Sequence, residues 1–141
     1  MKKTVMLSIR GQQDYGEQEP EIISLITEGT LERTAEGWVI SYKESDLTGL
    51  DGVTTTFFVE KDCVMLCRTG KLESQMVFRQ GVPHESLYQM EFGALMISVC
   101  ATAIRWDIDE SGGVIDLSYD IAIEQAAMGV VTYHLDIASN E

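Results

Sequence analysis

Apolar and polar residues alternate along most of this chain, in short runs that are separated by turn residues. The stretch "VIDLSYDIAI" (114–123) has large apolar residues at every second position: Ile115, Leu117, Tyr119, Ile121 and Ile123. Side chains of an extended strand alternate between two faces, whereas a helix would scatter these residues around its whole circumference. The alternation therefore predicts a β-strand that is buried on one face.

Turn signals such as "TGLDG", "QGVP" and "DESGG" recur at a spacing of roughly 8–15 residues. The run 86–104 is the least clear, because its Met, Ala and Leu residues tolerate a helix, but Gly93 in its middle favours two strands. The runs between the turns predict about ten strands, at 3–12, 21–33, 37–45, 53–60, 63–69, 72–80, 84–92, 94–107, 113–124 and 130–138.

Most connections between these strands are too short for a crossover, so neighbouring strands are expected to pair antiparallel as hairpins. Because nearly every strand is apolar on one face only, one continuous sheet can close on itself and remove its edges. We predict a single all-β domain over residues 1–141, an antiparallel meandering β-barrel of about eight to ten strands. A two-sheet sandwich is the second interpretation.

Two strands carry a charged residue on the face that their apolar residues predict to be buried. In "GWVISYKES", Glu44 shares its face with Trp38 and Tyr42, and in "VMLCRTG", Arg68 shares its face with Leu66. An unpaired ion in a poor dielectric costs several kcal/mol, so both charges need partners if they point inward. These two residues are the main candidates for a site.

The two charges have a structural and a functional interpretation. In the structural one, they form a mutual ion pair inside the barrel, supported by nearby hydroxyl groups. In the functional one, Arg68 and a tyrosine hold the carboxylate or phosphate group of a ligand, a task that suits the planar guanidinium. In a third interpretation, the side chains reach solvent at a strand end. The candidate ligand-binding residues are Arg68, Glu44, Tyr42, Thr56, Thr102 and Tyr119.

The charge balance restricts the partners. The chain has 23 acidic and 10 basic residues and a formal net charge of −13, which repels phosphate backbones and anionic lipid surfaces. We therefore expect no binding to nucleic acid or membranes. No apolar run reaches ~18–20 residues, and the first residues lack the apolar core of a secretory signal, which favours the cytoplasm. The sequence carries no argument for or against a homodimer.

Familiar catalytic motifs are missing, including the nucleophile elbow, the zinc-protease helix motif and the glycine-rich phosphate loops. Cys63 and Cys67 fall on one strand face but lie roughly 13 Å apart along an extended strand, too far for a disulfide or a shared metal. With Cys100, they are expected to be reduced thiols. We predict a protein that is not an enzyme and has no metal or cofactor.

Several short motifs occur in a particular order: "ISYKES", Gly49, Gly52, "TTT", "RTG", "MVFRQG", Tyr88, Gly93, Thr102 and "GGVIDLSYDI". In this order they resemble the YwiB-like family of small bacterial proteins, over roughly residues 3–138. The resemblance implies a lipocalin-like (calycin-type) β-barrel and no catalytic residues, because the family has no established biochemical function. Where this chain has "YQMEFG" and "EQAAMG", the family carries Tyr-Thr-Pro-like and asparagine-rich stretches, so these loops are expected to differ in shape.

Two hypotheses about function follow. In the first, the barrel binds a small, partly apolar and optionally anionic molecule in its interior, with Arg68 and Glu44 orienting the polar end. In the second, the barrel is closed and packed, holds no ligand, and acts as a protein-interaction module through its acidic surface. The interior volume separates them, because a cavity of about 300 Å³ or more favours the first.

Overall fold

The computed structural model describes residues 2–14, 16, 19–45, 51–90, 93–124 and 127–139. It confirms the predicted strands, including the two on either side of Gly93. Their bounds are β1 (Lys2–Asp14), β2 (Glu21–Arg33), β3 (Gly37–Lys43), β4 (Val53–Glu60), β5 (Cys63–Gly70), β6 (Ser74–Phe78), β7 (Pro83–Met90), β8 (Gly93–Asp109), β9 (Gly112–Ile123) and β10 (Ala127–Ser139). In these residues, no helix is long and apolar enough to cross a membrane.

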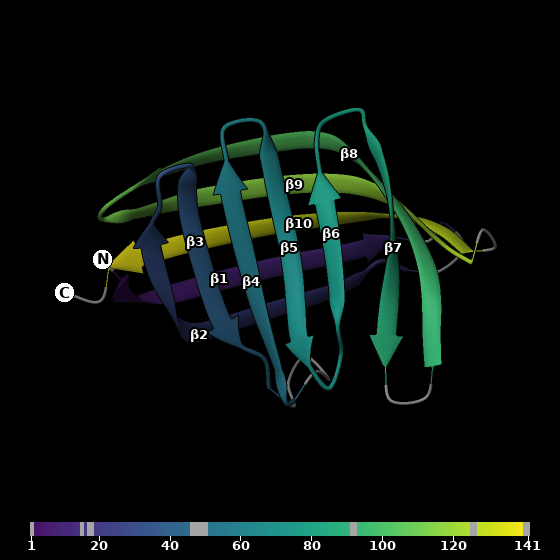
Figure 1. Ribbon diagram of the computed structural model, residues 1–141, viewed down its shortest axis with the longest axis horizontal. Helices are drawn as coiled ribbons and strands as arrows, with labels where there is room; N and C mark the ends of the chain where they lie inside the picture. Colours follow the sequence, from purple (N-terminus) through teal and green to yellow (C-terminus); the bar gives the residue numbers. More distant parts are fainter. Residues whose placement is uncertain are drawn as a thin grey trace.

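The strands form one antiparallel sheet in the order β6-β5-β4-β3-β2-β1-β10-β9-β8-β7. Except for β6 and β7, strands that are neighbours in sequence pair with each other, and β1 also pairs with β10, so the first and last strands lie side by side (Figure 1). The sheet curls into a nearly closed barrel, in which the wall of β3 to β7 crosses the wall of β1, β2, β9 and β10 at a steep angle (Figure 1). This confirms the predicted meandering barrel over the sandwich.

The barrel is incomplete at one seam, where β6 faces β7. Glu73 and Gln89 exchange two backbone hydrogen bonds of 2.8 Å at one end of the seam. At the other end, Val82 donates its backbone N–H to the carbonyl of Arg79 at 2.9 Å. Between these points, β6 pairs only with β5 and β7 only with β8 in the described residues. The wall of the barrel is therefore weakest along β6, from Ser74 to Phe78.

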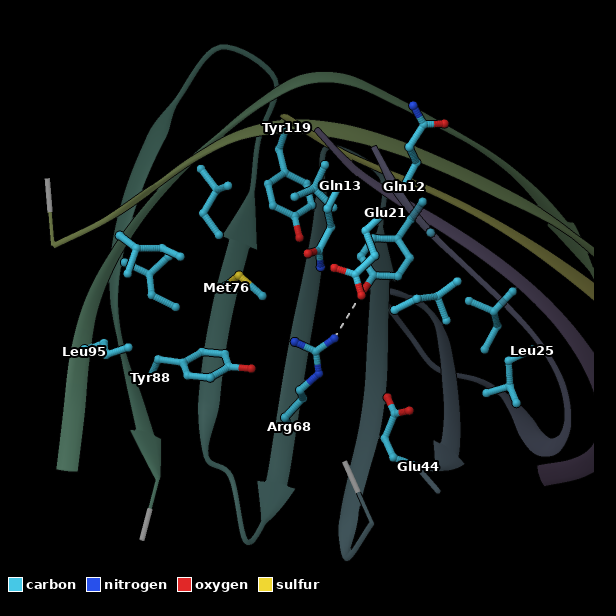
Figure 2. A pocket seen from close by; sticks show the side chains of 18 of the residues that line it. Gln12, Gln13, Glu21, Leu25, Glu44, Arg68, Met76, Tyr88, Leu95 and Tyr119 are labelled. Carbon is cyan, nitrogen blue, oxygen red and sulfur yellow. Dashed lines mark hydrogen bonds between the residues drawn. The ribbon is translucent and has the colours of Figure 1, made fainter. Parts of the chain in front are cut away.

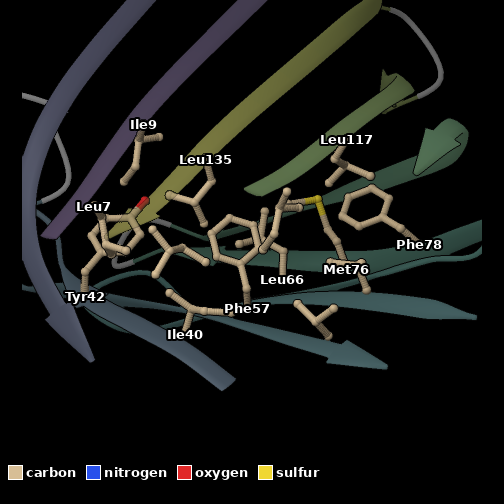
Figure 3. Close-up of a cluster of buried hydrophobic side chains, with 14 of the residues drawn as sticks. Leu7, Ile9, Ile40, Tyr42, Phe57, Leu66, Met76, Phe78, Leu117 and Leu135 are labelled. Carbon is tan, nitrogen blue, oxygen red and sulfur yellow. The ribbon is translucent and has the colours of Figure 1, made fainter. Parts of the chain in front are cut away.

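Alternation along the strands places one apolar face inside the barrel (Figure 3). Phe57 and Phe78 are the largest fully buried side chains, and the Phe78 ring packs at 4.5 Å, centroid to centroid, against Tyr119. The rest of this core includes Leu7, Leu31, Ile40, Leu66, Ile115, Leu117 and Leu135. Removing these side chains from water is the main stabilising contribution to such a fold.

A β-bulge in β8 changes which residues face inward. The register of β8 against β9 shifts between Ala101 and Ala103, so an extra residue, Thr102, is left on the outer surface. Before the bulge, Ala101 faces the core, and after it, Ile108 does. Strict alternation along the sequence would place Ala103 and Arg105 on the inward face with Ala101, whereas both are exposed after the bulge. A bulge leaves no clear signal in the sequence.

His134 lies on the outer face of β10 between two carboxylates. Its Nδ1 is 2.5 Å from Oδ1 of Asp116, and its Nε2 is 3.0 Å from Oδ2 of Asp136. The hydrogen bond to Asp116 is the largest cause that raises the pKa of His134 above its usual value. Burial opposes it, and the hydrogen bond to Asp136 adds to the rise.

We expect this cluster to make stability depend on pH. Because the pKa of His134 is raised in the folded protein, its contribution is fully present below the unfolded pKa of about 6.5 and is lost as the pH rises through the folded value. The effect is at most about 1 kcal/mol, since all three side chains are partly exposed. Urea unfolding at several pH values measures it. His134→Gln should flatten the profile, and an unchanged profile would contradict the assignment.

Candidate ligand-binding site

A cavity of about 390 Å³ lies inside the barrel, between the walls that the strands form (Figure 2). Its apolar lining comes largely from β1, β2 and β8 to β10 and includes Ile9, Leu25, Leu95, Ile97, Ile121 and Val131. Its polar lining includes Tyr42, Glu44, Arg68, Tyr88, Tyr119 and Tyr133. An apolar cavity with a few converging polar groups is the usual form of a small-molecule site.

Arg68 is the cation of this cavity. Its side chain extends from β5 into the space between Tyr88 and Tyr119 (Figure 2), and only 9% of its surface is exposed. Its Nη2 donates a hydrogen bond of 3.1 Å to the hydroxyl of Tyr133. Its Nε–H is buried and has no hydrogen-bond partner in the described protein. A buried cation with an unused donor is costly, so its retention here points to a ligand.

The surroundings keep Arg68 charged. Burial alone would lower the pKa of its guanidinium. Charge interactions with the nearby tyrosines outweigh burial and raise this pKa above its ordinary value; in decreasing order of effect, they involve Tyr133, Tyr88, Tyr119 and Tyr42. The site therefore offers a permanent positive charge inside an apolar cavity.

Glu44 directly follows β3 and is also buried, with 7% of its surface exposed. Its backbone N–H donates to the carbonyl of Val53 at 2.8 Å, which continues the pairing of β3 with β4. Its Oε2 accepts a hydrogen bond of 2.5 Å from Oγ1 of Thr55. Burial, then the Glu44 charge, and a hydrogen bond to Glu44 raise the pKa of Tyr42. The carboxylate is therefore held by hydroxyl groups.

The direct ion pair between Glu44 and Arg68 stays a prediction. Strand β4 lies between β3 and β5, and Thr55 is the register partner of both Tyr42 and Arg68. The backbones of strands two positions apart are separated by roughly 10 Å, so a contact between these two residues needs both side chains to extend along the inner face of the sheet. The salt bridges among the described residues include Arg33 with Glu110 and His134 with Asp116 and Asp136. Each buried charge has its own hydroxyl partners.

Comparison with known proteins identifies the family. Residues 7–137 match the family described as a domain of unknown function (DUF1934). The chain belongs to the DUF1934 family.

Two comparisons of this DUF1934 protein agree on the fold. It is 29% identical, over 111 residues, to the uncharacterized beta-barrel protein YwiB of Bacillus subtilis (strain 168), covering 79% of this chain and 75% of that protein. The crystal structure of the ywiB protein from Bacillus subtilis matches with a TM-score of 0.82 at 23% identity, covering 96% of this chain and 92% of that chain. The resemblance to the YwiB-like family is confirmed. Residues 91–92 and 125–126, in the loops expected to differ, lie outside the described residues.

The structure brings four of the six predicted site residues of this DUF1934 protein into the cavity: Tyr42, Glu44, Arg68 and Tyr119. Thr56 and Thr102 do not line it. Oγ1 of Thr56 lies 3.1 Å from Oγ of Ser41 on the outer face of the sheet. Thr102 is exposed at the bulge and donates to the carbonyl of Ser118 at 3.2 Å. The role of the four cavity residues stays a prediction.

Sequence reasoning missed Thr55, Tyr88 and Tyr133. Thr55 shares its strand face with Phe57, and Tyr133 shares its face with Leu135, so alternation alone could have placed both inside the barrel. Tyr88 stands in the one run where the element type was least clear. The three cysteines are free, and the described residues contain no group of three or more potential ligands for a metal ion.

Replacing Thr55 by valine tests the support of Glu44. We expect the variant to lose about 1.5–3 kcal/mol of unfolding free energy, because the buried carboxylate loses a short hydrogen bond. Thr56→Val is the matched control on the same strand; its hydroxyl faces outward and loses only a neutral, half-buried hydrogen bond to Ser41, so we expect a loss of about 1 kcal/mol or less. Urea denaturation measures both. Equal effects of the two substitutions would contradict this arrangement.

Proposed function

We propose that this DUF1934 barrel binds a small, partly apolar molecule with an anionic group in its cavity. Arg68 holds the anionic group, with Tyr133 and other cavity hydroxyls around it, and the apolar lining surrounds the rest of the molecule. The observation that carries the proposal is the buried guanidinium, whose Nε–H has no partner in the described protein, at the edge of a cavity of about 390 Å³.

The size of the cavity favours a ligand over a fully packed barrel. Small-molecule sites begin at about 300 Å³, so this cavity fits one small molecule. The lining is mostly apolar, which suits a hydrocarbon or ring, while a single cation suits a single anionic group. The interaction-module hypothesis does not account for either feature.

We propose binding without catalysis, because the Glu44 carboxylate and the Arg68 guanidinium are each engaged by hydroxyl groups of the protein. The three free cysteines support a reducing compartment such as the cytoplasm. The lipocalin-like interpretation of the barrel belongs to the same proposal.

Calorimetric titration with four ten-carbon probes that differ in their polar group tests this function: decanoate, decyl phosphate, decanol and decylamine. We expect decanoate to bind one molecule per chain, decanol to bind about tenfold or more weakly, and decylamine not to bind, because only the anion satisfies Arg68. Native mass spectrometry of protein purified without added probe identifies any ligand that it retains. Equal affinity for decanoate and decylamine, or no binding of any probe, would overturn the proposal.

A further inference from the structure

A second buried polar atom lies beside Arg68, on the adjacent strand. Ser74, on β6, is the register partner of Arg68 on β5, and both side chains face inward. The hydroxyl of Ser74 is buried and has no hydrogen-bond partner in the described protein. Among the described residues, the buried polar side-chain atoms without a partner are Nε of Arg68 and Oγ of Ser74. They occur as neighbours.

We propose that Arg68 and Ser74 together form a subsite for one carboxylate group, which accepts a hydrogen bond from Nε–H of Arg68 and another from the hydroxyl of Ser74. Unsatisfied buried polar groups are rare in native proteins. A carboxylate at this point satisfies both atoms at once, and its charge offsets that of Arg68. This inference deepens the proposed function, on which it rests, by naming the headgroup and its position.

The position of the subsite is at the seam of the barrel. A groove of about 550 Å³ follows the seam, and its lining includes Arg68, Ser74, Glu73 and His84. Arg68 lines both this groove and the interior cavity. Between the Glu73–Gln89 pair and the Val82–Arg79 bond, the seam is crossed by a long hydrogen bond of 3.4 Å from the Val77 N–H to Nδ1 of His84. The subsite therefore lies where the groove and the interior cavity share Arg68.

The charges around the subsite favour a carboxylate over a phosphate. Glu21 and Glu44 line the cavity on one side, and Glu73 and Glu85 line the groove on the other. Arg68 is the one cation among the described residues that line either space. A monoanionic ligand neutralises this cation. A dianionic ligand brings a second negative charge, which the neighbouring carboxylates repel.

Ser74→Ala tests the subsite by calorimetric titration. We expect its affinity for decanoate to fall about tenfold, because the carboxylate loses one hydrogen bond, and its affinity for decanol to stay unchanged. Decyl phosphate should bind wild type about tenfold more weakly than decanoate. The variant should fold, since the lost hydroxyl has no partner in the protein. Ser98→Ala, on the outer face of β8, is the matched control and should bind decanoate as wild type does.

The results separate this inference from the proposed function. If wild type binds decanoate and Ser74→Ala binds it equally well, the subsite is wrong and the proposed function stands. Preferential binding of decyl phosphate would also overturn the carboxylate subsite. If wild type does not bind decanoate, the proposed function fails, and acetate tests the subsite alone. Acetate should then shift the ¹⁵N resonance of Arg68 Nε in wild type and not in Ser74→Ala, and the absence of a shift in wild type would overturn the subsite.

Discussion

Replacing Arg68 by methionine is expected to weaken decanoate binding about 100-fold or more, while decanol binding changes little. The guanidinium is the cation of the cavity, and each hydrogen bond from it to an anion is worth about 1.5–3 kcal/mol. Methionine is unbranched and fills the space without a charge. Calorimetric titration of both probes against the variant measures the difference.

Two further variants test whether the loss of binding is specific to the guanidinium of Arg68. Arg105→Met removes an exposed arginine of β8, on the outer face of the barrel, and should bind decanoate as wild type does. Arg68→Lys keeps the charge but lacks the planar fork, so we expect an intermediate loss of about tenfold. Circular dichroism confirms that each variant is folded. If Arg68→Met retains decanoate binding in a folded protein, Arg68 is not the anion site.

Phe57→Ala is expected to lower the free energy of unfolding by about 3–5 kcal/mol, the largest stability effect that we predict for the core. The ring is 1% exposed and packs edge-on against Tyr133, with ring centroids 6.4 Å apart. Its loss leaves a cavity beside the residue that holds Arg68. We therefore also expect weaker decanoate binding. Urea denaturation measures the stability, with an unchanged slope showing that unfolding remains two-state.

Phe58 gives a matched control for this substitution. It is the next residue on the same strand, but it points to the opposite face and is only half-buried. We expect Phe58→Ala to cost about 1 kcal/mol. A loss from Phe58→Ala that equals the loss from Phe57→Ala would show that the inward face of β4 is assigned wrongly.

The sequence was sufficient to predict the strands and the barrel, because both depend on local signals. Alternation marked the inward face of each strand, and glycine-rich turns marked its ends, as at Gly93. Short connections then made antiparallel neighbours the simplest topology. Tyr42, Glu44 and Arg68 were placed inside the barrel by the same rule.

The details of the site depend on information that the sequence does not carry locally. The distance between Glu44 and Arg68 depends on the number of strands between them, which is a property of the sheet. The meeting of Tyr133 with Arg68, separated by 65 positions in the chain, depends on how the barrel closes. The bulge next to Thr102 reversed the faces of β8 without a clear residue signal.

A crystal structure of the protein grown with decanoate tests the central claim most directly. The account predicts one decanoate in the interior cavity, with its carboxylate within hydrogen-bonding distance of Nε of Arg68 and its alkyl chain along the wall formed by Leu25, Ile97 and Ile121. A cavity filled by the protein's own side chains, or decanoate bound only on the outer surface, would contradict the claim that this barrel is built around a buried anion-binding arginine.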